Sequence, residues 1–365
     1  MAIVHEYGPE EMLRRLADPW WFQALGCVLG FDWHSSGVTT VTCGALKEAQ
    51  KRLGPDLGII VAGGKGATSR KAPQEIAAAA DRHSIPAGDK LIYASRMSAK
   101  VDSAAVQDGY QLYHHCFFFT PGGAWCVVQQ GMSDAKGKAR RYHWLGETVN
   151  DFVCEPHAAV QNLSAAGAET DIASPQLVLN MVAEEAAANR RASSELVRED
   201  PERLLRFIRE QSGEPTLFAP NHHPVLPQDV NLARLEKIVR VAHERHPRDF
   251  ETLLGTPAVG PATIRSLALI AELIYDAPVS RRDPAQKNNC ALTELSKSAD
   301  SKRGERKWAD YSLAHGGKDG FPFPVDRKTY DRNIAVLSDA VRRARIGETA
   351  KTDALRRLAR VEQGL

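Results

Sequence analysis

The chain has 365 residues, of which 43% are hydrophobic and 25% charged, a globular composition that excludes a fibrous or largely disordered protein. Its formal net charge of +2 does not by itself indicate a nucleic-acid binder, although basic residues cluster in runs such as KGKARRYHW and SKRGERKW. With no signal peptide, no run of about 18 apolar residues and no CxxC pair among six cysteines, we expect a cytoplasmic protein without membrane contact, bound metal or other cofactor.

The first part of the chain, residues 1–155, predicts a mixed domain of α+β or α/β type. Residues 9–29 have the apolar spacing of a helix, and 57–66 and 90–97 have the short apolar runs typical of strands. Residues 110–132 predict a β-hairpin, because a Pro-Gly-Gly turn separates two apolar, aromatic-rich arms.

The composition changes after residue 155, and we expect 156–174 to be a linker. The segments with proline start signals or helical spacing predict helices over 175–192, 201–211, 229–245, 326–346 and 350–362. The polar run 285–310 predicts a loop. We therefore expect an all-α DNA-binding domain over 175–346, with a helical hairpin at 249–275, followed by a C-terminal helical tail over 347–365.

The run LLGTPAVGPATIRSLALIAELIY (253–275) predicts two helices joined by a tight turn. It resembles the helix-hairpin-helix motif of DNA-binding and DNA-repair proteins, whose turn reads Gly-hydrophobic-Gly. We expect Val259 to pack between the helices, Gly260 to let a phosphate approach, and Pro261 to open the second helix without losing a needed N–H. The first amides of that helix would then bind the anion, assisted by the helix dipole. Ala258 stands where the motif has its first glycine, which predicts a weaker or differently shaped contact.

The expected DNA contacts include residues outside this turn. The glycine-rich run 63–66 lacks the spacing of a nucleotide-binding P-loop, so we interpret the cations around it as contacts to a DNA backbone. The predicted DNA-binding residues are Val259, Gly260, Pro261, Thr263, Arg265, Lys65, Arg70 and Lys71.

The run FPVDRKTYDR (323–332) resembles the segment that carries the catalytic aspartate of helix-hairpin-helix DNA glycosylases, with Asp326 in the place of that aspartate. The resemblance implies that Asp326 stabilises positive charge on the sugar or activates a water. Ile264 stands where bifunctional members carry a lysine nucleophile, which implies a monofunctional enzyme. Asp326 lies 66 residues after Gly260, farther than in that family, and the alternative is that it caps the next helix.

A second polar cluster flanks the predicted β-hairpin, in AKVDSAAVQDGYQLYHH (99–115) and the facing arm. Polar side chains beside apolar strands require partners. The run QDGY with its following histidines is similar to the water-activating loop of uracil-type DNA glycosylases, so Asp102 and Asp108 are candidate catalytic residues. The two aspartates also suit Mg²⁺ in a nuclease, although VVQQGM lacks the Glu-x-Lys of the commonest nuclease hairpin, and a structural network is the remaining alternative. The predicted base pocket comprises Gln107, Tyr110, His114, His115, Gln129 and Gln130.

Several long strings extend over most of the chain, among them WHSSGVTT, GGKGATSRKAPQEI, WCVVQQGM and HGGKDGFPFPVDRKTYD. Over residues 1 to 346 they resemble the prokaryotic family known as domain of unknown function 763, which implies little about activity beyond the hairpin. The leading hypothesis is a monofunctional DNA glycosylase that excises an altered or modified base, in repair or in defence against modified phage DNA. A Mg²⁺-dependent nuclease and a non-catalytic DNA-binding adaptor are the alternatives.

Overall fold

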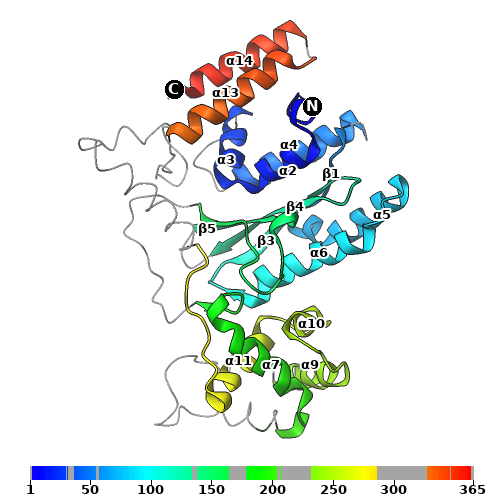
Figure 1. The fold of residues 1–365 in the computed structure, drawn as a ribbon, viewed down its shortest axis with the longest axis vertical. Helices are drawn as coiled ribbons and strands as arrows, with labels where there is room; N and C mark the ends of the chain where they lie inside the picture. The colour runs from blue at the N-terminus through cyan, green and yellow to red at the C-terminus, as the bar shows by residue number, and fades with distance from the viewer. Residues whose placement is uncertain are drawn as a thin grey trace, which may run out of the picture.

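The computed structural model describes residues 2–29, 31, 37–54, 57–133, 138–163, 178–203, 206, 232–285, 327–345 and 347–362. These residues form a mixed α+β fold in which a five-stranded antiparallel sheet lies between two layers of helices (Figure 1). The strand order is β1 (Ile60–Lys65), β3 (Gln111–Phe119), β4 (Trp125–Ser133), β5 (Lys138–Leu145) and β6 (Ala159–Asn162).

The hairpin of β3 and β4 forms the centre of this sheet, which confirms the predicted β-hairpin. Its turn is closed by the backbone N–H of Thr120, which donates to the carbonyl of Ala124 at 2.9 Å. Because side chains alternate along a strand, neighbouring residues of β3 enter different cores. Phe117 packs in the core on one face of the sheet, and Cys116 and Phe118 pack in the core on the other.

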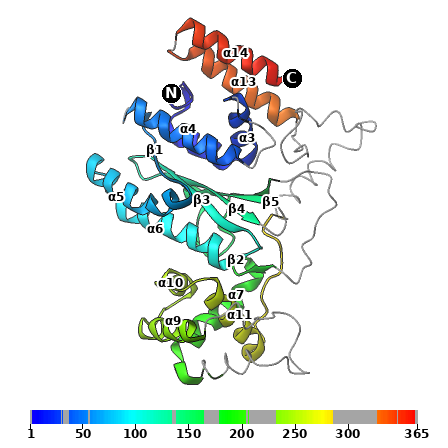
Figure 2. The ribbon, with the colours of Figure 1, turned by 180° about the vertical axis from the view of Figure 1, so that it is seen from behind.

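One face of the sheet is covered by the N-terminal helices, with the C-terminal helices outside them (Figure 2). The predicted helix over 9–29 is two helices, because Pro19 opens a new one and the Asp18 carboxylate accepts the backbone N–H groups of Trp20 (2.8 Å) and Trp21 (3.1 Å). The layer comprises α1 (Ala2–Tyr7), α2 (Pro9–Ala17), α3 (Pro19–Val28), α4 (Val38–Leu53), α13 (Arg327–Arg343) and α14 (Glu348–Glu362).

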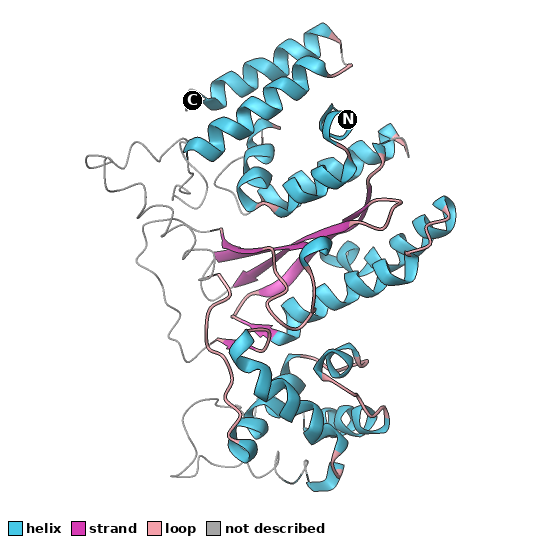
Figure 3. Cartoon of the chain, in the orientation of Figure 1, coloured by secondary structure: helices cyan, strands magenta, loops and turns pink. Residues whose placement is uncertain are grey.

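The opposite face is covered by α5 (Ala72–His83) and α6 (Gly88–Lys100), and α6 continues into a π-helical turn, η3 (Val101–Ala105). Beyond α6 lies a group of four helices (Figure 3): α7 (Ala187–Arg198), α9 (Leu232–Glu244), α10 (Phe250–Gly255) and α11 (Pro261–Tyr275). Phe117 and Phe119 of the sheet belong to the same continuous apolar core as Leu253, Val259 and Leu267 of these helices. The position of α10 and α11 is therefore fixed by the core that also supports the sheet.

Three further predicted elements differ in the structure. The predicted strand over 90–97 is wrong, because this segment lies in helix α6; its buried face alternates Leu91 and Met97 with alanine and serine, which obscures the helical period in the sequence. The predicted helix over 175–192 is wrong at its start, since β7 (Leu179–Asn180) pairs there with β2 (Val106–Gln107), and α7 begins only at Ala187.

The predicted linker over 156–174 contains strand β6, which pairs with β5 through the buried residues Ala159 and Val160. Nearly all of the loop expected at 285–310 and most of the helix expected at 201–211 lie outside the described residues. Within the described part of the chain, no helix combines the length and apolar character that a membrane span requires.

We expect His143 to make the stability of the fold sensitive to pH. Its side chain is fully buried on β5, where Nδ1 donates to the carbonyl of Leu16 at 3.0 Å, and burial together with the nearby Arg141 guanidinium holds its pKa well below the usual value. Unfolding restores the ordinary pKa of about 6.5, so below that pH the unfolded chain takes up a proton that the folded protein does not. We expect the free energy of unfolding to fall by up to about 1.4 kcal/mol per pH unit for this group as the pH drops from about 6.5.

Urea unfolding between about pH 7 and about pH 5 measures this slope. His143→Phe should reduce it, because one proton-binding group is lost. Val128→Ala, which alters the residue opposite His143 on β4, should lower stability by a similar amount at every pH. An unchanged slope in His143→Phe contradicts the assignment.

Candidate functional site

The α10–α11 hairpin, Phe250–Tyr275, is built around a buried valine. Helix α10 is capped by Asp249, whose Oδ1 accepts the backbone N–H (2.8 Å) and the hydroxyl (2.6 Å) of Thr252. Val259 in the turn is fully buried. Ala258 has a φ of 67°, the left-handed conformation that costs an L-residue about 1–2 kcal/mol and that glycine adopts freely. The turn therefore adopts at Ala258 a glycine-like conformation, although the residue is alanine.

The start of α11 is partly exposed at the tip of this turn: Gly260 and Ala262 are half-buried, and Thr263, a predicted DNA contact, is buried. Gly260 is its N-cap, in an extended conformation and without a side chain to cap the helix, and Pro261 is the first helical residue. The amides of Ala262 and Thr263 precede the first intrahelical donor, the backbone N–H of Ile264, which donates to the carbonyl of Gly260 at 3.0 Å. Ala258 and Pro261 beside them are exposed to solvent. An accessible helix start with unpaired N–H groups and the positive end of the helix dipole has the physical character of an anion site.

Side chains from the α6–β2 segment hold this turn in place. The Lys100 ammonium, whose pKa is lowered by burial, donates to the carbonyl of Val259. Gln107 Nε2 donates to the carbonyl of Pro261 at 2.9 Å, and Gln107 Oε1 accepts from Arg265 Nε at 2.9 Å. The structure thus brings Gln107, expected in a base pocket, together with Arg265, expected on DNA. Their pairing orients the start of α11.

Asp102 lies on η3 at the centre of a buried network. Its Oδ2 accepts from Gln129 Nε2 (2.5 Å) and from Trp144 Nε1 (2.9 Å), and its Oδ1 accepts from His157 Nε2 (2.5 Å). The residue is 1% exposed. Burial of a carboxylate is costly unless donors compensate it, and here three donors from β4, β5 and the segment after β5 do so.

The same network continues to His115 through Gln129. Gln129 Oε1 lies 2.8 Å from His115 Nδ1, which therefore carries the proton, and His115 Nε2 accepts from the Ser95 hydroxyl at 2.9 Å. Burial lowers the pKa of His115 to about 4. The imidazole is accordingly neutral at pH 7, and it links α6 to the central strands.

Asp108 belongs to a second buried cluster. Its Oδ2 accepts from Arg140 Nη1 at 2.7 Å and from the Tyr142 hydroxyl at 2.8 Å, and Arg140 Nη2 also donates to Asp283 at 2.8 Å. The Arg140 guanidinium stacks over the ring of Tyr110, 4.5 Å from its centroid. The charge of Asp108 is thus neutralised by an arginine, and the residue is 4% exposed.

The residues predicted to form a base pocket do not face one open space. Tyr110, His114, His115, Gln129 and Gln130 are all buried, and alternation along β3 and β4 places His114 and Gln130 on the face opposite to His115 and Gln129. The structure brings Asp102, His115 and Gln129 together and separates them from His114 and Gln130. Asp326 lies outside the described residues.

The glycine-rich run at the end of β1 has a packing role. Gly63 has a φ of 85°, and a Cβ there would lie 2.2 Å from the carbonyl oxygen of His115, so only glycine fits against β3. Its carbonyl accepts from Lys47 Nζ at 2.7 Å. The expected DNA contacts Lys65, at the end of β1, and Arg70 and Lys71, on η2 (Gly66–Lys71), are exposed on a different segment from the α10–α11 hairpin.

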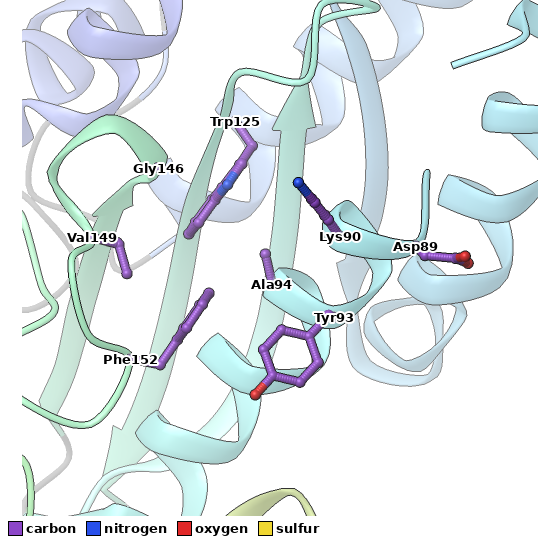
Figure 4. Close-up of a pocket in the computed structure, with 8 residues that line it drawn as sticks. All are labelled: Asp89, Lys90, Tyr93, Ala94, Trp125, Gly146, Val149 and Phe152. Carbon is purple, nitrogen blue, oxygen red and sulfur yellow. The ribbon is translucent and has the colours of Figure 1, made fainter. Parts of the chain in front are cut away.

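A cavity of about 420 Å³ lies between α6, the start of β4 and the loop that follows β5 (Figure 4). The rings of Trp125 and Phe152 stack with an interplanar angle of 2°, and Tyr93 packs edge-on against Phe152 with 5.7 Å between centroids. A Cβ on Gly146 would lie 2.6 Å from the Trp125 ring, so this glycine permits the indole position. Lys90 extends toward the cavity, whereas Asp89 points away from it (Figure 4).

The cavity is linked to the α10–α11 hairpin. The Tyr93 hydroxyl donates to the Glu251 carboxylate on α10. The pKa of Tyr93 is raised mainly by burial and, second, by this hydrogen bond. Tyr93 and Lys100 lie on the same helix, so α6 borders both the cavity and the turn, about 10 Å apart along its axis.

Sequence reasoning missed the residues of the cavity and two members of the buried networks. Tyr93 was hidden by the strand prediction, and Trp125 and Phe152 carry no motif. His157 fell in the predicted linker, and Arg140 was visible only as one of a run of basic residues. The signal available in the sequence was the helical spacing of Tyr93, Met97 and Lys100, once alanine and serine count as buried.

The fold and the site define a class: an α+β protein in which an antiparallel sheet with buried polar networks supports an exposed helical hairpin. The family model described as "Protein of unknown function (DUF763)" matches residues 1–325, so the chain belongs to this family. No curated protein and no solved structure matches the chain.

Proposed function

We propose that the protein binds the phosphate backbone of DNA through the α10–α11 hairpin. The observation that carries the proposal is the partly exposed start of α11, which follows a turn with Ala258 in the left-handed conformation and Val259 buried. Unpaired amides at such a helix start favour a phosphate. Arg265 and Lys100 contribute positive charge close to the turn, where Lys100 donates to Val259.

A contact of this kind reads no sequence. Backbone amides contact phosphates, which are the same at every base pair, so the hairpin positions the protein on DNA and specificity comes from elsewhere. Binding should weaken as salt rises, because each phosphate contact releases counterions.

Gly260→Asp tests the hairpin directly. Gly260 has an extended φ of −140°, and the nearest atom to a new Cβ is a carbonyl oxygen at 3.9 Å, so an aspartate fits there. Aspartate is a favoured N-cap, and we expect stability to be unchanged or raised by about 1 kcal/mol. The new carboxylate occupies the phosphate position, and we expect affinity for a random-sequence duplex to fall about tenfold or more, measured by fluorescence anisotropy at low salt.

Gly347→Asp is the matched control. Gly347 also precedes a helix, its carbonyl accepts from Lys351 N–H at 3.0 Å, and nothing lies within 4 Å of a Cβ placed there. The Gly347→Asp substitution adds the same charge at the start of α14 and should leave DNA binding unchanged. Equal affinities for Gly260→Asp and Gly347→Asp would contradict the proposal. Ala258→Gly should retain binding, because glycine adopts the same φ without strain.

A second proposal concerns the activity: base excision by a DNA glycosylase, favoured by the aromatic cavity beside α10. A glycosylase extrudes its base into a pocket where aromatic rings stack on it. The cavity of about 420 Å³ has the size of small-molecule sites, and Trp125, Phe152 and Tyr93 supply the rings. The carboxylate candidates are Glu251, held at the Tyr93 hydroxyl, and Asp326 through the resemblance of its segment.

The two buried aspartates are weaker candidates for a catalytic role than the residues at the cavity. Asp102 accepts three hydrogen bonds in the core, and Asp108 is paired with Arg140, whose charge opposes a bound Mg²⁺. We therefore assign both a supporting role and do not propose a nuclease at these two residues.

Tyr93→Ala tests the cavity. With DNA carrying damaged or modified bases in EDTA, we expect alkali-labile breaks from the wild-type protein. Loss of one stacking ring, worth about 1–3 kcal/mol, should slow break formation about tenfold. Tyr275→Ala is the matched control, since Tyr275 is similarly exposed and also donates to a glutamate, Glu199.

Glu251→Gln and Asp326→Asn identify the catalytic carboxylate. Replacing the catalytic residue should abolish base excision without lowering the affinity for DNA. Breaks that require Mg²⁺ and no alkali contradict the glycosylase and indicate a nuclease. Intact but retarded DNA with every substrate contradicts both enzymes and indicates an adaptor.

A further inference from the structure

Two cysteine sulfur atoms and one histidine nitrogen lie close together on the face of the sheet covered by α4. His114 and Cys116 lie two residues apart on β3, so both side chains point to this face, and Cys43 approaches from α4. The two sulfur atoms and one imidazole nitrogen all lie within 4.8 Å of one another, and the three residues are each 1% exposed.

His114 lacks the partners that a buried imidazole requires. Neither Nδ1 nor Nε2 has a hydrogen-bond partner among the described residues, although the ring is 1% exposed. A neutral imidazole has one donor and one acceptor, and leaving a buried one unsatisfied costs about 1–3 kcal/mol. By contrast, His115 on the opposite face satisfies both nitrogens, through Gln129 and Ser95. A ligand at His114 would account for the difference.

We propose that Cys43, His114 and Cys116 bind one zinc ion. Two thiolates and an imidazole are ligands that Zn²⁺ prefers, with bonds of about 2.3 Å to sulfur and about 2.0 Å to nitrogen. With these bond lengths, the ligand atoms of a tetrahedral site lie about 3.5–3.8 Å from one another. Side-chain rotations that move each ligand atom by about 1 Å would therefore bring the three atoms to zinc-binding distance. Binding releases the two thiol protons, and Zn²⁺ with two thiolates is electrically neutral, as a buried site requires.

The site escapes the usual sequence criterion, which looks for closely spaced cysteine pairs. Here two ligands share a strand as His-x-Cys, and the third comes from a helix 71 residues earlier than His114. The proposal departs from our sequence-based expectation that the chain binds no metal. The zinc proposal is independent of the proposed DNA function, since it rests on the opposite face of the sheet.

Metal titration of the full chain tests the proposal. The protein is purified under reducing conditions, freed of metal with a chelator and titrated with Zn²⁺, and we expect one equivalent to bind. Titration with Co²⁺ should give thiolate-to-cobalt charge-transfer absorption and the intense visible bands of a tetrahedral site. Zn²⁺ should also raise the thermal unfolding temperature, because it binds only the folded site.

Cys43→Ser and Cys116→Ser should each abolish stoichiometric binding, and His114→Gln should weaken it. Cys126→Ser is the matched control: Cys126 is another fully buried cysteine on the same face, opposite Phe118 on β4, and lies outside the three-residue cluster. It should bind zinc as the wild type does. Substoichiometric binding by the wild type, absence of the charge-transfer band, or full binding by Cys43→Ser would overturn the proposal. The wild-type Co²⁺ spectrum decides the matter even if a serine variant does not fold.

Discussion

The buried carboxylate of Asp102 is the interaction on which the arrangement of this protein depends. Asp102 lies in the π-helical turn that follows α6, and its carboxylate accepts hydrogen bonds from β4, β5 and His157. A charged group can stay in the core only while these donors surround it, because an unpaired buried carboxylate costs several kcal/mol. The carboxylate thus fixes the end of α6 on the sheet in one position.

Helix α6 transmits this constraint to the surface. Tyr93 near its start borders the aromatic cavity, Lys100 at its end holds the carbonyl of Val259, and Gln107 just beyond holds the start of α11. A rigid element with a buried anchor positions a surface site more precisely than a loop does. The cavity and the hairpin turn are therefore held at a fixed separation, which the proposed glycosylase would need in order to bind the backbone and receive a base.

Local patterns predicted part of this arrangement. The β3–β4 hairpin followed from the glycine turn between apolar arms, and α10 and α11 followed from their apolar spacing, because each depends on neighbouring residues alone. The polar cluster around Asp102, His115 and Gln129 was also expected, since polar residues beside apolar strands require partners. The complete burial of this cluster was not expected, because it depends on packing against α6, and the sequence pattern of residues 90–97 predicted a strand in place of this helix. The cavity depends on contacts between Tyr93, Trp125 and Phe152, which lie far apart in the chain and share no motif.

The central claim is that Asp102 couples the sheet to the α10–α11 hairpin within one core. Native-state hydrogen exchange, compared between the wild type and Asp102→Asn, measures this coupling most directly. We predict that the amides of Phe117 in β3 and of Leu267 to Ala271 in α11 exchange with a similar free energy of opening, and that the substitution lowers both by the same amount. Loss of protection in β3 alone, with α11 unchanged, would contradict the account.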